Sequence, residues 1–116
     1  MMDASAPLVS EIILHKKSKT LEVVFATGER FILPCEYLRV FSPSAEVRGH
    51  GVGNEKLITG KEHVNILTLE PVGNYAVKPI FSDGHASGIY SWKTLYELGK
   101  HYSENWANYL KKTNKE

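Results

Sequence analysis

The chain has 116 residues, of which 42% are hydrophobic and 23% charged, and its formal net charge is +1. This length suits one domain around one core, and the composition is that of a globular protein and not of a disordered one. The near-neutral charge argues against a strong electrostatic grip on nucleic acid, which needs a concentrated basic surface.

The chain contains a single cysteine, Cys35. It therefore cannot form an internal disulfide, and it cannot by itself hold an iron–sulfur cluster or a cysteine-rich zinc site. Residues 1–14 carry neither a basic leader nor a long apolar run, so we expect no signal peptide. No stretch approaches the ~20 apolar residues of a membrane-spanning helix. We expect a protein without a membrane span, in the reducing cytoplasm.

Alternating apolar residues predict a first group of strands. After a flexible terminus over 1–9, strands are expected over 10–16, 21–25 and 31–33. In the second of these, Leu21, Val23 and Phe25 alternate along the chain and so share one face. Gly28 tolerates a positive φ and marks a hairpin turn.

A short helical turn and a long loop follow. Pro34 suits the first position of a helix that ends before Pro43. The glycine-rich stretch 48–61 predicts a surface loop. It does not match a phosphate-binding loop, because Glu62 follows Gly60-Lys61 where that motif needs serine or threonine.

A second strand pair is predicted over 64–70 and 75–82, around a turn at 71–74. Pro79 lies inside the second strand of this pair. Because proline cannot donate a hydrogen bond to a neighbouring strand, its position indicates an edge strand or a bulge.

The C-terminal part is predicted to be helical. Apolar residues recur there at helical spacing, at Trp92, Leu95, Gly99, Tyr102, Trp106 and Tyr109. This stripe is typical of a core-facing helix, and a partner-binding face is the alternative. We expect Gly99 to end a first helix and Ser103 to cap a second. Strands first and helices last predict an α+β fold: one small β-rich domain over 10–112, with about five to six largely antiparallel strands covered by C-terminal helices.

The histidines do not form a recognisable metal motif. They are scattered at His15, His50, His63, His85 and His101. There is no His-x-Asp/Glu pair to begin a 2-His-1-carboxylate iron site. His85 stands out because it follows Asp83-Gly84 in a polar turn. Two interpretations stay open for it, turn structure and ligation.

Several segments together resemble one known family. They contain Ser42-Pro43-Ser44-Ala45-Glu46-Val47-Arg48-Gly49-His50-Gly51, Leu69-Glu70-Pro71-Val72-Gly73-Asn74-Tyr75-Ala76-Val77 and Phe81-Ser82-Asp83-Gly84-His85. The chain resembles the γ-butyrobetaine hydroxylase-like N-terminal domain family, in its stand-alone bacterial form, over roughly residues 10–110. The resemblance implies a small β-rich domain closed by helices. It also implies relatives fused to carnitine-pathway dioxygenases or to P-loop ATPases that carry iron–sulfur clusters.

The resemblance also implies a zinc site in the dioxygenases, of the form Cys-Pro-Cys-x-x-Cys with a later histidine. Those positions fall here on Ser42, Ser44 and Val47, and on His85. Valine has no lone pair to give and serine is a poor zinc ligand. We therefore expect no structural zinc, with packing and turn hydrogen bonds in its place, and we leave the cofactor open with iron as a candidate.

The catalytic iron domain of the relatives has no counterpart here, so we expect no enzyme activity. The first hypothesis is a non-catalytic binding or accessory module, a protein-interaction domain linked to metal or iron–sulfur cluster handling. Its ligand patch is expected at Arg48, His50, Asp83 and His85. The alternative is a small iron- or zinc-binding protein that uses His85, or an accessory chain of a carnitine-type 2-oxoglutarate dioxygenase. The expected partner is a protein.

Overall fold

The computed structural model describes residues 7–43, 61–86 and 88–113. Along these residues the elements are β1 (Val9–His15), β2 (Thr20–Phe25), β3 (Arg30–Pro34), α1 (Cys35–Val40), β4 (Ile66–Val72), β5 (Ala76–Phe81), β6 (Tyr90–Ser91), α3 (Trp92–Lys100) and α4 (Tyr102–Thr113). The strands form two antiparallel sheets, in the orders β1-β2-β3 and β4-β5-β6. The α+β fold, with six described strands and C-terminal helices, is thereby confirmed. None of the described helices is long and apolar enough to cross a membrane.

The first sheet follows the predicted alternation. Leu21, Val23 and Phe25 of β2 are at most 1% exposed and point into the core. Leu33 of β3 lies directly opposite Leu21, so β3 adds to the same apolar face. Gly28, at φ 96°, adopts the left-handed conformation that the β2–β3 turn needs.

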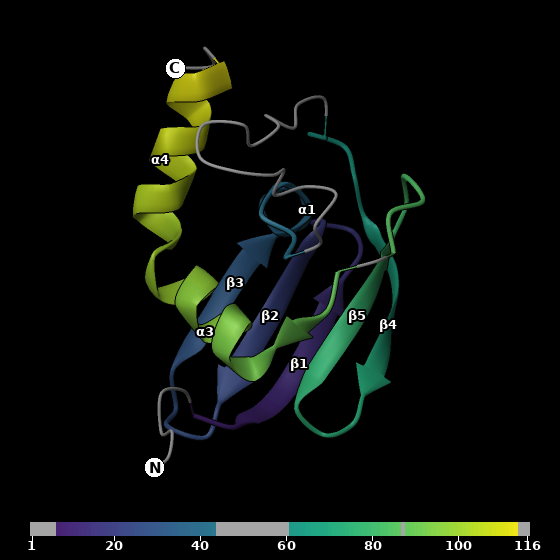
Figure 1. Cartoon of the computed structure of the whole chain (residues 1–116), viewed down its shortest axis with the longest axis vertical. Helices are drawn as coiled ribbons and strands as arrows, with labels where there is room; N and C mark the ends of the chain where they lie inside the picture. The colour runs from purple at the N-terminus through teal and green to yellow at the C-terminus, as the bar shows by residue number, and fades with distance from the viewer. Residues whose placement is uncertain (1–6, 44–60, 87, 114–116) are drawn as a thin grey trace.

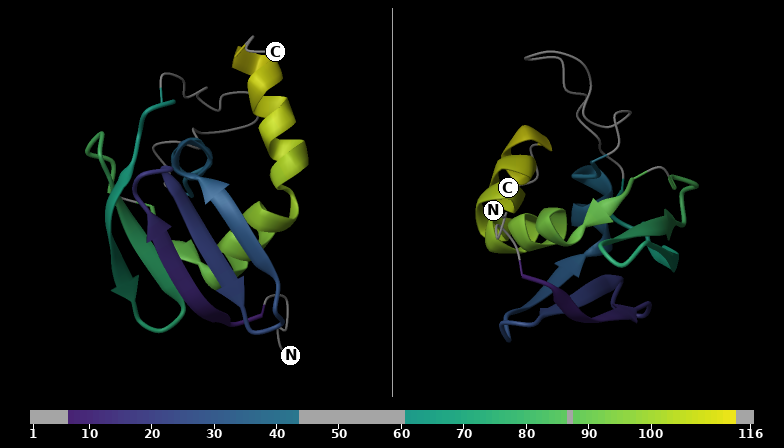
Figure 2. Two further views of the ribbon diagram at one scale, coloured as in Figure 1. Left: turned by 180° about the vertical axis from the view of Figure 1, so that it is seen from behind. Right: turned by 60° about the horizontal axis from the view of Figure 1, so that its bottom comes forward.

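The core lies between the two sheets and is closed by the C-terminal helices. Figure 1 shows α3 crossing one face of the first sheet, with α4 continuing beyond its edge strand β3. The second sheet stands beside β1. Seen from behind, in the left panel of Figure 2, the other face of the first sheet carries no described helix or strand. The first sheet therefore has one covered face and one open face.

Gly99 does not end a helix, contrary to the expectation. α3 runs one residue past it, and His101 is the C-cap. A Cβ atom at Gly99 would lie 2.4 Å from Cδ2 of Phe31, so glycine is required here for the close approach of α3 to β3. Ser103 lies inside α4 and is not its cap, because α4 begins one residue earlier.

Pro79 is not on an edge strand, because β5 is the middle strand of the second sheet. The strand tolerates proline because β6 is short and pairs only with Ala76 and Val77. The other explanation that the sequence indicated was a bulge. An irregularity of this kind lies on the neighbouring strand β4, where the register shifts between Ile66 and Thr68.

The turn between β4 and β5 begins later than expected. β4 continues through Val72, so only the last part of the predicted turn over 71–74 is a turn. Gly73 has φ 54°, the left-handed conformation that a tight reversal favours.

Candidate functional site

Asp83 lies at the centre of a polar cluster between β5 and β6. Its Oδ2 accepts a hydrogen bond of 2.8 Å from Arg39 Nε and one of 2.7 Å from Lys61 Nζ. Its Oδ1 accepts the backbone N–H of His85 at 3.1 Å. Arg39 belongs to α1 and Lys61 precedes β4, so one carboxylate connects three segments that are distant in the sequence.

The pKa of Asp83 reflects this crowding. Partial burial acts to raise it, but the hydrogen bonds from Lys61, from the His85 backbone and from Arg39 outweigh burial and hold the pKa well below its usual range. The carboxylate therefore stays ionised throughout the neutral range, as a counter-ion for both cations.

One donor of this cluster, Arg39 Nη1, has no acceptor among the described residues. The Arg39 side chain is only 11% exposed, and its Nη1 atom is buried without a hydrogen-bond partner among the described residues. An unpaired buried donor costs about 1–3 kcal/mol. Asp83 thus holds Arg39 in place at Nε, while Nη1 is left without a partner in the part of the chain that the structure describes.

His85 is buried, with 8% of its surface exposed, and its backbone and ring are both engaged. Its carbonyl accepts the N–H of Phe81 at 3.0 Å, which closes the turn after β5. Its ring Nε2 forms a hydrogen bond of 3.1 Å with Oγ of Ser42. The imidazole therefore ties the β5–β6 connection to the segment that follows α1.

Tyr90 and Gly88 also connect the β5–β6 segment to α1 and to the residues that follow it. The Tyr90 hydroxyl donates a hydrogen bond to the carbonyl of Leu38 in α1. Burial raises the pKa of Tyr90 well above its usual range, although a hydrogen bond with Ser42 and the charge of Arg39 oppose the shift. A Cβ at Gly88 would lie 2.4 Å from the Ser42 hydroxyl, so only glycine lets the two segments approach this closely.

Of the four residues predicted for a ligand patch, Asp83 and His85 lie in one turn, where the carboxylate contacts Arg39 and Lys61 and the imidazole contacts Ser42. Arg48 and His50 lie outside the described residues, as do Ser44 and Val47 and all but the last residue of the glycine-rich loop 48–61. The sequence interpretation did not include Arg39 and Lys61. No local pattern could have found them, because they meet Asp83 only through the fold.

The described groups do not fit the zinc site of the relatives. The first cysteine position, Ser42, does lie beside the histidine position, His85. A hydroxyl and an imidazole that bind each other are not a zinc donor set, which needs thiolates or further imidazoles. Cys35 is buried elsewhere, with its Sγ 3.7 Å from Asn65 Oδ1, and burial raises the pKa of its thiol. No group of three or more His, Cys, Asp or Glu residues that could hold a metal occurs in the described part of the chain.

A second polar cluster lies on the open face of the first sheet. Glu22 Oε1 is 2.8 Å from His15 Nε2, and Oε2 is 3.0 Å from Arg30 Nη1. Strand register places Glu22 between Ile13 and Ile32. Ile32 is 55% exposed. We call Ile13, Glu22, Val24 and Ile32, with His15 and Arg30 around them, the open face.

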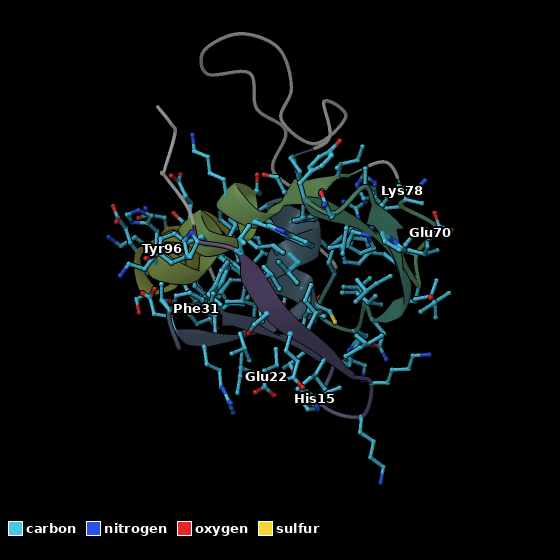
Figure 3. All side chains as sticks on the ribbon, turned by 90° about the horizontal axis from the view of Figure 1, so that it is seen from below. His15, Glu22, Phe31, Glu70, Lys78 and Tyr96 are labelled. Atoms are coloured by element: carbon cyan, nitrogen blue, oxygen red, sulfur yellow. The ribbon has the colours of Figure 1, made fainter. Side chains whose placement is uncertain are left out.

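Figure 3 shows how the two sides of this sheet differ. Phe31 and Tyr96 meet on the helix side, with ring centroids 6.2 Å apart. Glu22 and His15 project from the opposite side. The alternation that predicted a buried face for β2 also places Glu22 and Val24 on the other face, so the sequence contained a signal for the open face.

Comparison with known proteins gives the family of the chain. The family model described as gamma-butyrobetaine hydroxylase-like, N-terminal, matches residues 12–96. One solution NMR structure is 49% identical, with a TM-score of 0.82, over 98% of this chain and 85% of that chain. A second is 47% identical, with a TM-score of 0.79, over 92% and 84% of the two chains. None of the curated proteins compared with the chain matches it.

A third similar structure is the crystal structure of a protein of unknown function from Acidithiobacillus ferrooxidans, described as a member of the DUF971 family. It is 38% identical, with a TM-score of 0.69, over 84% of this chain and 98% of that chain. The chain belongs to the γ-butyrobetaine hydroxylase-like N-terminal domain family, in the form of a domain of unknown function.

Proposed function

We propose that this chain is a non-catalytic binding module that docks a partner protein on the open face of its first sheet. The observation that carries the proposal is the apolar row on that face, where Ile13 and Ile32 flank Glu22 with no described element above them. Solvated faces of antiparallel sheets are usually polar. Apolar side chains gathered on a solvent-facing sheet surface are typical of a protein interface.

The contacts of Asp83 and His85 support the non-catalytic part of this proposal. A catalytic pair needs a nucleophile or a base directed at a substrate. Both oxygens of Asp83 are taken by donors from the protein itself. The ring of His85 binds Ser42. These groups act as internal ties between segments.

A second element of the proposal concerns what the partner protein does. We propose that the partner handles a metal or an iron–sulfur cluster, since the resemblance implies relatives fused to cluster-carrying ATPases. The alternative of a small metal-binding protein has less support, because the carboxylate of Asp83 turns to Arg39 and Lys61 and not to the imidazole of His85.

The experiment is affinity capture from native lysate with three matched baits. They are the wild-type chain, Ile32→Lys on the open face, and Leu67→Lys on β4. Ile32 and Leu67 are equally suited to the comparison, with 55% and 51% of their surfaces exposed on edge strands of different sheets. We expect a protein that is retained by wild type and Leu67→Lys and lost from Ile32→Lys. Identical capture by all three baits, or loss with Leu67→Lys alone, would contradict the proposal.

A further inference from the structure

A groove of about 300 Å³ lies between the end of α1 and the helices α3 and α4, away from the open face. Its apolar side is formed by Phe41, Pro43 and Leu98. The Phe41 ring is fixed against the ring of Tyr37, with centroids 4.9 Å apart. The volume is near the lower end of the range for small-ligand sites, about 300–1,000 Å³.

The polar side of the groove is a row along the helices, formed by Thr94, Glu97, His101 and Asn105. Residues three or four apart on a helix share a face. The row continues across the junction of α3 and α4, because the His101 N–H donates to the Glu97 carbonyl and the Asn105 N–H donates to the His101 carbonyl. The two helices therefore present one polar wall to the groove.

Two groups on this wall, the Asn105 carbonyl oxygen and the Glu97 carboxylate, can accept hydrogen bonds from a ligand. The Asn105 amide nitrogen donates to the Tyr37 hydroxyl at 3.1 Å, which leaves its carbonyl oxygen to receive a donor. The hydroxyl of Thr94 accepts a hydrogen bond from Ser91 Oγ at 3.0 Å and keeps its own proton to donate. The Glu97 carboxylate lies among the lining groups, and no ion pair or hydrogen bond reaches it from the described residues. Among the described residues that line the groove, the one acidic or basic side chain besides His101 is thus the negative Glu97.

Among the described residues, no cation is paired with this carboxylate. Lys100, the basic residue of the last turn of α3, has its Nζ 3.4 Å from Glu29 Oε2 and lies over the ring of Tyr96, on the side of the sheet. On the outer rim of the groove, His101 faces a further acid, with Nδ1 3.9 Å from Glu104 Oε1. A ligand that enters the groove meets a negative wall and an apolar floor.

We propose that this groove binds an alkylammonium or guanidinium group on a short apolar stem. The cationic head would donate hydrogen bonds to the Glu97 carboxylate and the Asn105 carbonyl oxygen, and the stem would lie against Phe41 and Leu98. Charge-assisted hydrogen bonds are the stronger kind, and they favour such a head over a neutral one. Two sources carry this chemistry, a free small amine and a lysine or arginine side chain of a protein.

The test is an NMR titration of the ¹⁵N-labelled chain at about pH 8 and low salt, where an ordinary imidazole is neutral. The probes are n-butylammonium and n-butylguanidinium, with n-butanol and butyrate as neutral and anionic controls. We expect the two cations to shift the amide signals of Leu98, His101 and Asn105, and the controls to leave them in place. Glu97→Gln should weaken butylammonium binding about tenfold, or ~1.4 kcal/mol. Glu104→Gln, which alters an acid outside the lining, should weaken it less than about twofold.

Equal binding of butanol and butylammonium would overturn the proposal, and so would unchanged binding by Glu97→Gln or signal shifts confined to other parts of the chain. A further arm compares butylammonium with Nα-acetyl-lysine methylamide. Tighter binding of the free amine indicates a small-molecule ligand, and tighter binding of the blocked lysine indicates a protein side chain; either supports the proposed chemistry. The groove and the open face are separate, so failure here leaves the capture experiment with Ile32→Lys unaffected.

Discussion

The carboxylates of Asp83 and Glu22 each lie between two nitrogen-bearing side chains. Asp83 connects segments from different parts of the fold, whereas Glu22 connects neighbouring strands of one sheet. Asp83 joins Arg39 of α1 and Lys61 ahead of β4 to the β5–β6 connection. The sequence separations are 44 and 22 residues. Glu22 joins His15 and Arg30, which lie on the two strands next to its own in one sheet.

The partners of the two carboxylates also differ in exposure. Arg39 is 11% exposed at its side chain, whereas Arg30 is 60% exposed; the carboxylates themselves rank the other way, with Glu22 at 9% and Asp83 at 22%. An exposed ion pair contributes little to stability, while breaking a buried one leaves a charge without compensation. The comparison indicates that the Asp83 cluster stabilises the fold, whereas the Glu22 cluster belongs to a surface that can exchange its contacts for those of a partner.

The largest expected effect is that of Asp83→Asn. The substitution removes the counter-charge of Arg39 and Lys61 and places an amide where two donors converge. We expect a loss of about 2–3 kcal/mol in the free energy of unfolding, below the full cost of breaking a buried pair because Asp83 is partly exposed. Urea denaturation measures this loss. Glu70→Gln, which breaks the exposed 3.4 Å pair with Lys78, is the control and should change stability by less than about 0.5 kcal/mol.

The contribution of Asp83 to the free energy of unfolding should also depend on pH. The folded state holds the pKa of Asp83 below its usual value, which for a free aspartate is about 3.9. The contribution of the ionised carboxylate is therefore fully present above about pH 4 and is lost as the pH falls toward the folded-state pKa. We expect the stability difference between wild type and Asp83→Asn to be constant from about pH 7 to pH 5 and to shrink below about pH 4. A difference that grows in acid would contradict this assignment.

His85→Asn is expected to have an intermediate effect. Asparagine keeps a polar side chain in the turn but is too short to reach Ser42 in place of the imidazole. We expect a loss of about 1–2 kcal/mol, from one hydrogen bond and reduced packing on Phe81. A double-mutant cycle with Ser42→Ala should give a coupling energy of about 0.5–1.5 kcal/mol. Additive effects would show that the two side chains do not depend on each other.

Glu22→Gln should lower the free energy of unfolding by less than Asp83→Asn or His85→Asn. The Glu22 side chain is only 9% exposed, but its partners are exposed and can turn to solvent, and glutamine can still accept from one of them, so we expect a loss of about 1 kcal/mol. Thermal and urea unfolding measure it. If Glu22→Gln destabilised the protein as much as Asp83→Asn, the distinction between a stabilising cluster and a surface cluster would fail.

The smallest expected effect is that of metal removal. At the zinc positions of the relatives, Ser42 and His85 bind each other, and we predict that the chain folds without metal. A structural zinc contributes directly to folding free energy where it is present. The thermal midpoint should therefore be the same before and after dialysis against EDTA. A large drop would mean that ligands outside the described residues hold a metal.

Sequence reasoning succeeded where the determining contacts are local. The alternation of Leu21, Val23 and Phe25 predicted their buried face, and Gly28 predicted the hairpin, because each depends on a few neighbouring residues. It failed at Gly99, since the reason for that glycine is a ring on β3, 68 residues earlier, and not the end of its own helix.

The candidate site was predictable only in part, for the same reason. Asp83 and His85 are two residues apart in one turn, so sequence could pair them. The partners that define their role, Arg39 and Ser42, lie 44 and 43 residues away. Ser42 was recognised only through a family motif, and the hydrogen bond that it makes requires the register of β5 and the position of α1.

The most direct test of the docking proposal uses the captured partner and a methyl-labelled chain. Isoleucine and valine methyl groups lie on the open face at Ile13, Val24 and Ile32, and an exposed isoleucine outside it, Ile89, serves as an internal reference. We predict that the partner shifts or broadens the three open-face signals and leaves that of Ile89 unchanged. Perturbation of Ile89 with the open-face signals unchanged would contradict the assignment of this face as the binding surface.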